Sequence, residues 1–420
     1  MARSISDPRF PPTLRRLRDE RGLSLRELGR RVHHSKTYLH ELETGVKTPT
    51  VETAQALDVV LDAGGELARM VSVDTGGVRR RTFVAAAGIA AALPHQRLAF
   101  GRRVGADLPA QLVTRAARLR RLDDYLGGAD TYRLYAAEVE STKTLIRDGS
   151  YTEATGLGLL AVLAEQAQLA GWAAFDAGLH GDADRLYRTS LAAAQDAADP
   201  ALAGNAWAFI AYLRLGLGQP GVDEAVAAVE TAGPGVTPGV RALLHCRRAW
   251  AHAVMGQAAD AERHLALGAT ALTEHDDRPE PDWVYWVDRS EVEIMTGRCW
   301  TVLRRPLRAI TVLEQVLAAY DDTHARDKAL YLSWLADAYL DAHEVEQACE
   351  TAGRAVELSA GVGSIRPGQR IDGFLGRLDP YGSLPCVVDL RARAVEWART
   401  GRRLTSAATP DTPPPPPRSA

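Results

Sequence analysis

The residues best suited to chemistry in this chain are cations near its start. The first 50 residues hold eleven Lys and Arg side chains against six Asp and Glu, although the 420-residue chain has a net charge of −3. A small basic region on an acidic body suits a polyanionic partner, because phosphate contacts supply the sequence-independent part of nucleic-acid affinity. Charge alone leaves a second interpretation open, which is an unevenly charged surface exposed to solvent.

Local start and stop signals place these cations on short helices. The segment Ser24-Leu25-Arg26-Glu27 is a capping box, which predicts a helix from residue 25 to about residue 32. Ser35 can cap a following helix over residues 36–44, and Gly45 can end it in a left-handed conformation.

Flanking helices are predicted on both sides of this pair. Leu14 and Leu17 share one helical face before Gly22, and the segment Thr48-Pro49-Thr50 opens a helix over residues 51–61 with a regular apolar stripe. Residues 10–70 therefore read as a domain of five short helices.

The segment LSLRELGRRVHHSKTYLHELETGVKTPTVETAQAL, residues 23–57, resembles the Cro/C1-type helix-turn-helix, also called the xenobiotic-response-element (XRE) family. The resemblance implies a lambda-repressor-like DNA-binding domain over residues 10–70, whose recognition helix near residues 35–44 enters the major groove. It nominates three kinds of contact residue. Base or phosphate contacts fall to Lys36, Thr37 and His40, the border of the groove to Ser35 and Tyr38, and phosphate contacts to Arg26, Arg30 and Lys47.

Two positions depart from the usual pattern of that family. Gln is common where Leu25 stands, and Gly is common in the turn where His33 stands. Leu25 cannot hydrogen-bond a phosphate or a base, whereas His tolerates a left-handed turn better than most residues. An alternative therefore stays open, in which the protein is an interaction scaffold and its N-terminal domain, residues 10–70, which we call the head, no longer reads DNA.

Residues 110–405 are helical by pattern, so the fold class is all-α. Helix pairs are predicted to turn at Gly178, Gly218, Gly256, Gly297 and Ala342, in steps of 38 to 45 residues. Pairs too small to bury their own apolar faces predict an α-solenoid. All eight Trp residues lie here, and we expect most in the core and a few in a ligand groove.

The segment LAGWAAFDAGLHGDADRLYRTSLAAA, residues 169–194, resembles a tetratricopeptide repeat. The resemblance implies close helix packing at Gly171, a turn at Gly178, and the repeat's alanine and aromatic positions at Ala183 and Tyr187. Such arrays bind peptides or partner helices in a concave groove.

Two segments have unusual composition. Residues 71–109 are predicted to be a linker, although Arg80-Arg81-Thr82-Phe83 and the apolar run after it resemble a twin-arginine export signal. Such signals belong at an N-terminus, so a linker helix is the preferred interpretation. Residues 406–420 form a proline-rich tail that we expect to be disordered.

Patterns for catalysis, cofactors and metals are missing from the sequence. The Gly-Gly pairs lack a following Lys-Ser/Thr, and the acidic run from His275 to Asp282 matches no Ca²⁺ loop. The four cysteines form no Cys-x-x-Cys pair, and no stretch of about 18 apolar residues predicts a membrane span. We therefore expect no enzyme activity, no cofactor, no metal site and a cytoplasmic location.

The order of a DNA-binding head and a solenoid body resembles that of actinobacterial Cro/C1 regulators with tetratricopeptide bodies. This resemblance implies a bacterial transcription regulator that binds double-stranded DNA as a homodimer. A peptide, small molecule or protein in the solenoid groove would control it. Besides the scaffold, a DNA-binding regulator without a ligand remains open, its solenoid serving only to dimerise or recruit a partner.

Overall fold

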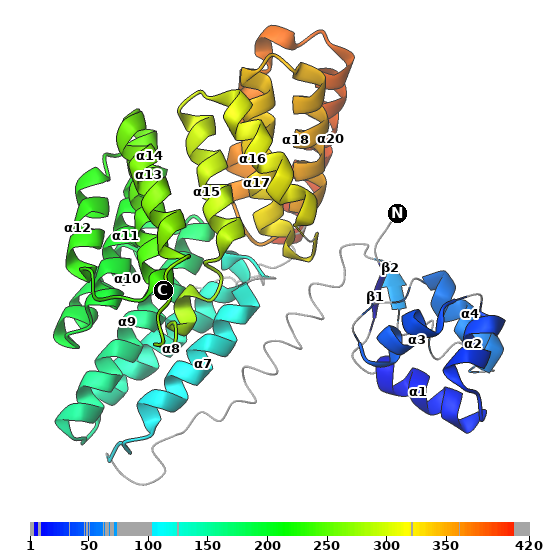
Figure 1. The fold of residues 1–420 in the computed structure, drawn as a ribbon, viewed down its shortest axis with the longest axis horizontal. Helices are drawn as coiled ribbons and strands as arrows, with labels where there is room; N and C mark the ends of the chain where they lie inside the picture. The colour runs from blue at the N-terminus through cyan, green and yellow to red at the C-terminus, as the bar shows by residue number, and fades with distance from the viewer. Residues whose placement is uncertain are drawn as a thin grey trace, which may run out of the picture. The chain divides into compact units, whose positions relative to one another are not determined.

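The computed structural model describes residues 4–6, 10–32, 34–45, 47, 49, 51–61, 63, 67, 71–73, 103–123, 126–320, 322–360 and 362–406. The chain divides into two compact units, Met1–Ile89 and Ala90–Ala420 (Figure 1). Helices dominate both. The expectations for His33, for the segment 79–94, for most of the linker and for the tail after residue 406 lie outside the described residues.

The first unit packs short helices around a leucine-rich core. Its described helices are α1 (Phe10–Glu20), α2 (Leu25–Arg31), α3 (Lys36–Glu43) and α4 (Val51–Leu61). The strands β1 (Ser4–Ser6) and β2 (Val71–Val73) pair antiparallel, which the sequence patterns did not indicate. The largest apolar side chains of the core are Phe10, Leu14, Leu28, Leu39, Leu42, Leu57, Leu61 and Leu67, each 0% exposed.

The predicted capping box of α2 is confirmed. The Glu27 amide donates to Ser24 Oγ at 3.2 Å, and the Ser24 amide donates to Glu27 Oε2 at 2.9 Å. Gly22 and Gly45 have φ of 62° and 74°, so both occupy the left-handed region that the helix ends require.

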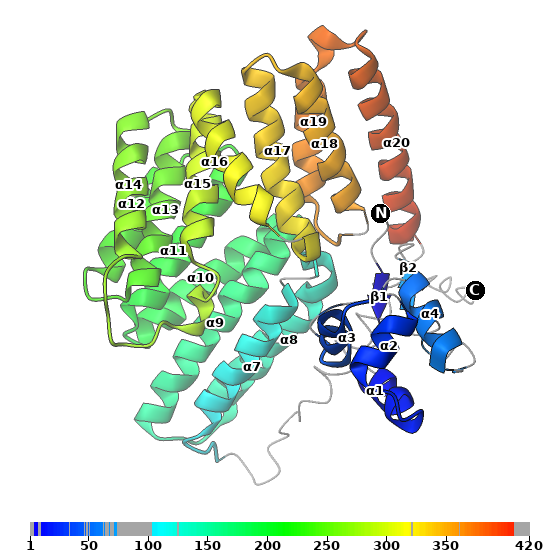
Figure 2. The same cartoon turned by 45° about the vertical axis from the view of Figure 1, so that its right-hand side comes forward.

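Antiparallel helices follow one another through the second unit (Figures 1 and 2). It begins with α7 (Leu108–Asp123) and α8 (Gly128–Asp148) and ends with α19 (Arg366–Arg377) and α20 (Pro385–Ser406). Between them lie five pairs of helices. The pairs are α9 (Glu153–Asp176) with α10 (His180–Asp196), α11 (Pro200–Gly216) with α12 (Val222–Ala232), α13 (Pro238–Val254) with α14 (Ala258–Ala271), α15 (Arg289–Val302) with α16 (Pro306–Ala319), and α17 (Ala325–Asp341) with α18 (Val345–Ser359).

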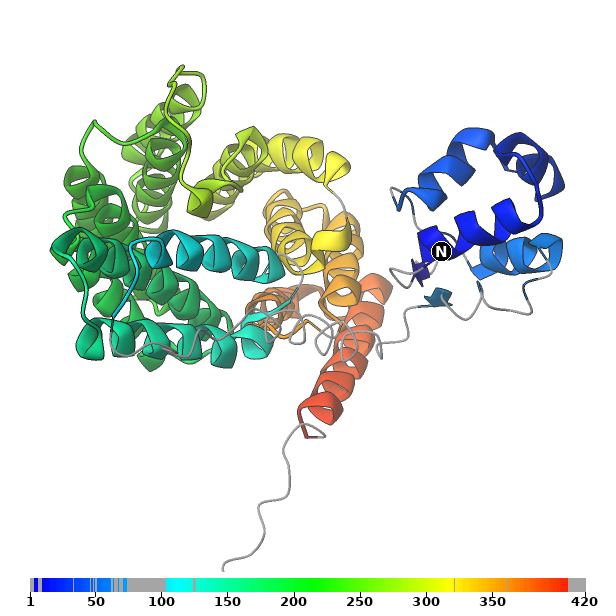
Figure 3. The same cartoon turned by 90° about the horizontal axis from the view of Figure 1, so that it is seen from below.

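Each first helix of a pair contacts its partner and the first helix of the next pair. The first helices α9, α11, α13, α15 and α17 therefore form an inner layer. Viewed from below, this layer follows a curved path (Figure 3). Together with α7, α19 and the segment around the short helix η1 (Asp282–Val284), these helices line a cavity of about 340 Å³.

Three of the predicted turn positions are confirmed by backbone geometry, since Gly178, Gly218 and Gly256 all have φ between 72° and 80°. The turn predicted at Gly297 is wrong, because that residue lies inside α15. Its missing side chain instead admits the α16 residue Leu313, whose Cγ would be 2.5 Å from a Cβ at position 297. The chain turns at Arg304, with φ of 55°.

Ala342 ends α17, and the left-handed residue of that turn is His343, with φ of 65°. Arg304 and His343 thus occupy a conformation that the other pairs assign to glycine.

Helix α9 is the apolar centre of the second unit. Its 24 residues are long and apolar enough, by composition, to cross a membrane, and 72% of the relevant window is buried inside the fold. The helix contacts α7, α8, α10 and α11. Packing against these four neighbours accounts for its apolar composition.

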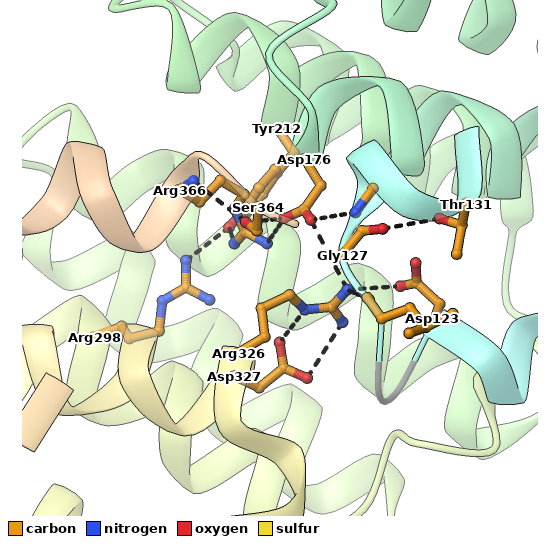
Figure 4. Close-up of polar contacts among 12 residues, drawn as sticks. Asp123, Gly127, Thr131, Asp176, Tyr212, Arg298, Arg326, Asp327, Ser364 and Arg366 are labelled. Atoms are coloured by element: carbon orange, nitrogen blue, oxygen red, sulfur yellow. Dashed lines mark hydrogen bonds and ion pairs between the residues drawn. The ribbon is translucent and has the colours of Figure 1, made fainter. Parts of the chain in front are cut away.

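A buried carboxylate connects both ends of the second unit (Figure 4). Asp176 ends α9 and is 0% exposed. Its Oδ2 accepts the Gly128 amide at 2.8 Å at the start of α8, and its Oδ1 accepts the Ser364 hydroxyl at 2.7 Å before α19. Two segments far apart in the chain are thereby held against the same helix end.

The cysteines form no disulfide. Cys246, Cys299 and Cys349 are buried and Cys386 is half-buried. Burial raises the pKa of the Cys246 thiol to about 12, which keeps it protonated and unreactive at neutral pH.

The close approach at Gly171 gives a stability test. A Cβ at this position would lie 2.5 Å from Tyr187 Cε1, and both residues are buried between α9 and α10. We expect Gly171→Ala to lower the free energy of unfolding of the second unit, because overpacking costs about 1–3 kcal/mol whereas the gain in helix propensity is about 1 kcal/mol.

The control is Gly181→Ala in α10, where a Cβ would meet nothing within 4 Å. Urea unfolding followed by Trp fluorescence reports this unit, because all eight Trp residues belong to it. Equal midpoints for the two variants would contradict the assigned packing.

Candidate nucleic-acid interface

The turn between α2 and α3 is fixed by one backbone hydrogen bond and one side-chain cap. The His34 amide donates to the Gly29 carbonyl at 2.9 Å, and the Tyr38 amide donates to Ser35 Oγ at 3.0 Å, so Ser35 caps α3. A Cβ at Gly29 would lie 2.5 Å from the His34 carbonyl oxygen. Gly29 therefore sets the spacing of the two helices, a role that we did not assign from sequence.

The first turns of α3 present the predicted base-contact residues to solvent. The side chains of Lys36, Thr37 and His40 are exposed. Within the described residues, none of the three has a hydrogen-bond or ion-pair partner. Lys36 and His40 are four residues apart and share one face of the helix.

The two residues expected to border the groove support the helix itself. Ser35 already uses its hydroxyl as the cap acceptor. The Tyr38 ring packs partly against the core of the unit and lies 4.8 Å from the ring of His34, centroid to centroid. Only the remaining exposed part of each side chain is available to a partner.

The residues predicted to contact phosphates differ in how many charged partners they already have. Arg26 and Arg30 are exposed one turn apart on α2. Neither forms a hydrogen bond or ion pair with a described residue, although the charge of Arg30 acts on the nearby Glu27 carboxylate. Lys47 is 54% exposed, but its Nζ lies 2.8 Å from Glu41 Oε2. Arg31 is exposed on the same helix and forms no hydrogen bond or ion pair with a described residue, although its charge acts on the Glu27 carboxylate. It is a further candidate for a phosphate contact that the sequence analysis did not select.

One cation of the basic region serves the fold instead of a partner. Arg18 in α1 donates from Nε to Glu43 Oε1 at 2.6 Å and from Nη1 to the Leu23 carbonyl at 2.9 Å. The hydrogen bond to Glu43 raises the pKa of Arg18. This nearly buried pair ties α1 to the end of α3, so a count of charges overstates the cations that are free.

Leu25, which stands where the family commonly has Gln, is half-buried against the core of the first unit. An apolar side chain therefore anchors the start of α2 by packing. The position does not supply a polar contact of its own.

The acidic run around His275 is divided among separate partners. Asp276 binds Arg278, whereas Glu280 accepts the Gly239 amide at 2.7 Å and Asp282 pairs with Arg120. Over the described ranges, no three His, Cys, Asp or Glu side chains are grouped to hold a metal ion.

Comparison with known proteins identifies the first unit. A family model described as Helix-turn-helix domain matches residues 12–70. No curated protein and no solved structure matches the chain. The chain therefore carries a helix-turn-helix domain, and this domain indicates DNA binding.

Arg18 is paired with Glu43 whereas Arg26 is exposed, and this difference gives a prediction. We expect Arg18→Gln to lower the local free energy of opening in the first unit by about 1–3 kcal/mol, because it leaves a nearly buried Glu43 carboxylate without its charged partner. Arg26→Gln removes the same charge from an exposed position that has no partner among the residues the structure describes, and should leave this free energy unchanged.

Hydrogen exchange of the full chain, read from peptides covering residues 10–45, measures both variants. Equal exchange rates in the two variants would mean that Arg18 does not hold α1 against α3.

Proposed function

We propose that this protein is a sequence-specific DNA-binding transcription regulator of the Cro/C1 type. The observation that carries the proposal is the set Lys36, Thr37 and His40 at the start of α3, whose side chains are exposed and have no partner among the described residues, in a domain matched as helix-turn-helix. Recognition helices of this class read base edges with their N-terminal residues. Arg26 and Arg30 on α2 supply cations for the flanking phosphates.

The second half of the proposal concerns the helices of the second unit, which we call the body. We interpret the helix pairs α9 to α18 as a tetratricopeptide-like solenoid that controls the head through a ligand, peptide or partner. Three observations support this interpretation: each first helix contacts the next first helix, left-handed residues form the turns, and Gly171 packs against Tyr187. The inner layer of first helices is the part of such arrays that binds ligands.

Control would operate through a homodimer in a bacterial cytoplasm. Two heads engage two half-sites when their spacing matches about one helical turn of DNA. A ligand that binds one arrangement of the bodies more tightly shifts the population toward it. The protein then acts without a catalytic step.

DNA binding is tested by capture of sheared genomic DNA, followed by titration of the recovered fragments. We expect wild-type protein to recover discrete fragments, and Lys36→Ala to weaken binding to them. If Lys36 contacts a phosphate, the slope of log K against log salt concentration should become less negative by about 0.9 in the variant. If it contacts a base, the loss should be about 1–3 kcal/mol and depend on sequence. His40→Ala should weaken binding only to selected sequences.

The matched control is Arg16→Ala, which removes one positive charge from α1, where Arg16 pairs with Glu20 at 2.7 Å. Equal binding by Lys36→Ala and Arg16→Ala would remove α3 from the interface. Recovery of no discrete fragments would favour the scaffold, in which the head does not read DNA.

A further inference from the structure

The cavity of the second unit has the size of a small-molecule site. Its volume is about 340 Å³, at the lower end of the range of about 300–1,000 Å³ for ligand pockets. An extended peptide needs a longer groove. Indole and phenyl rings from α9, α11 and the η1 segment form much of the wall, including Trp172, Phe209, Trp283 and Trp286.

Three guanidinium groups meet at one phenol in this wall. Arg298 Nη2 donates to Tyr212 Oη at 2.9 Å, and Arg366 Nη2 donates to the same oxygen at 3.2 Å. The third guanidinium, that of Arg247, lies 4.7 Å from the centroid of the Tyr212 ring. In Figure 4, Arg298 and Arg366 reach Tyr212 from different helices.

Aromatic faces hold these arginines where carboxylates would normally do so. The guanidinium of Arg298 lies 4.6 Å from the Trp250 ring, and that of Arg366 lies 4.7 Å from the Trp172 ring. Arg247 has no hydrogen-bond or ion-pair partner among the described residues. Such contacts position a cation without neutralising its charge.

A buried donor also lacks an acceptor at this place. Arg298 is 5% exposed, yet its Nε has no hydrogen-bond partner among the described residues. Unmet buried polar atoms are uncommon and cost free energy, so they point to a missing group. Arg298 is one of the residues that line the cavity, so a ligand oxygen placed beside its Nε would satisfy this donor.

The nearby acids do not cancel this charge. Asp176 is occupied by the Gly128 amide and the Ser364 hydroxyl as well as by Arg366, at 3.5 Å. Glu291 accepts the Tyr331 hydroxyl at 3.0 Å, and burial raises the pKa of its carboxyl. The charges of Arg247 and Arg298 also act on the Glu291 carboxyl. Three cations therefore face two carboxyl groups, and both of these have other hydrogen-bond partners.

The cations elsewhere on the wall are balanced. Arg120 pairs with Glu165 and Asp282, and Arg326 pairs with Asp123 and Asp327. Positive charge without an ion-pair partner of its own is thus concentrated at the end formed by Arg247, Arg298 and Arg366, which we call the arginine end.

We propose that the cavity binds a small organic anion, with its carboxylate or phosphate at the arginine end and its flat apolar body against the aromatic wall. Guanidinium groups recognise both kinds of anion through paired N–H donors, and the rings exclude water around them. This inference deepens the ligand-controlled half of the proposed function. It is tested without DNA, so its failure leaves the DNA-binding proposal standing.

The test uses the full-length protein and isothermal titration calorimetry. The probes are indole-3-acetate and phenyl phosphate, with the uncharged indole-3-acetamide as a matched control for the first. We expect both anions to bind and the amide to bind at least about 10-fold more weakly, since a hydrogen bond to a charged group contributes about 1.5–3 kcal/mol. Equal binding of acid and amide, or binding of neither anion, would overturn the proposal.

The variant of choice is Arg247→Gln, because within the described part of the chain this side chain makes no hydrogen bond whose loss would disturb the fold. We expect about 10- to 100-fold weaker binding of both anions. Arg248→Gln is the control, since it removes the same charge from the next residue of α13. The Nε of Arg248 donates to His252 Nε2 at 3.4 Å. Equal effects of the two variants would show general electrostatics instead of a site.

Tyr212 provides a second readout. Burial alone would raise the pKa of its phenol, but Arg298, Arg366 and Arg247 outweigh burial and lower the pKa to about 7. The charged and titratable groups that act on it are these arginines from α15, α19 and α13 and the Tyr187 phenol of α10. Asp176 contacts one of the arginines, Arg366, at 3.5 Å. The phenolate that forms as pH rises through about 7 neutralises part of the arginine end.

We therefore expect anion affinity to fall as pH rises through about 7 in the wild type and to change less in Tyr212→Phe. Bound anion should in turn raise the pKa of Tyr212 and reduce the phenolate ultraviolet absorbance measured just above that pH. An affinity that does not depend on pH in the wild type would mean that the anion lies away from Tyr212.

Discussion

The second unit depends on the burial of one carboxylate. Asp176 is 0% exposed, and a buried charge is tolerated only where hydrogen bonds and cations replace water. The groups that replace water come from the start of α8, from the segment before α19 and from Arg326 of α17, whose Nη1 lies 4.0 Å away. Burying Asp176 therefore brings Arg366, 190 residues later in the chain, to the wall of the cavity.

Local signals in the sequence were sufficient to predict where the helices of the first unit begin and end. The capping box at Ser24 and Glu27, the cap at Ser35 and the stop at Gly45 each involve residues within four positions of one another, so the sequence displays them directly. The pairing of Arg18 with Glu43 spans 25 residues and lacked such a signal. The sequence therefore does not distinguish a cation that pairs within the fold, such as Arg18, from one that is exposed to a partner, such as Arg26.

The second unit shows where pattern reading fails. Glycine marks turns at Gly178, Gly218 and Gly256, but Gly297 marks the close approach of Leu313, and sequence alone does not separate these uses. Repeat spacing predicted the helix pairs because it is periodic. The arginine end was not predicted, because Arg247, Arg298 and Arg366 come from three helices that meet only after the pairs have packed.

The construction of the cavity wall has a consequence for how such proteins diversify. Each inner helix contributes only a few side chains to the wall, whereas the turns and the contacts with outer helices lie elsewhere on the same helix. Substitution of a side chain that one helix contributes to the cavity wall can change which molecule fits in the cavity, without altering how the helix pairs pack together. Duplicated genes for a body of this kind could therefore acquire new chemical preferences one helix at a time, each step leaving a folded protein.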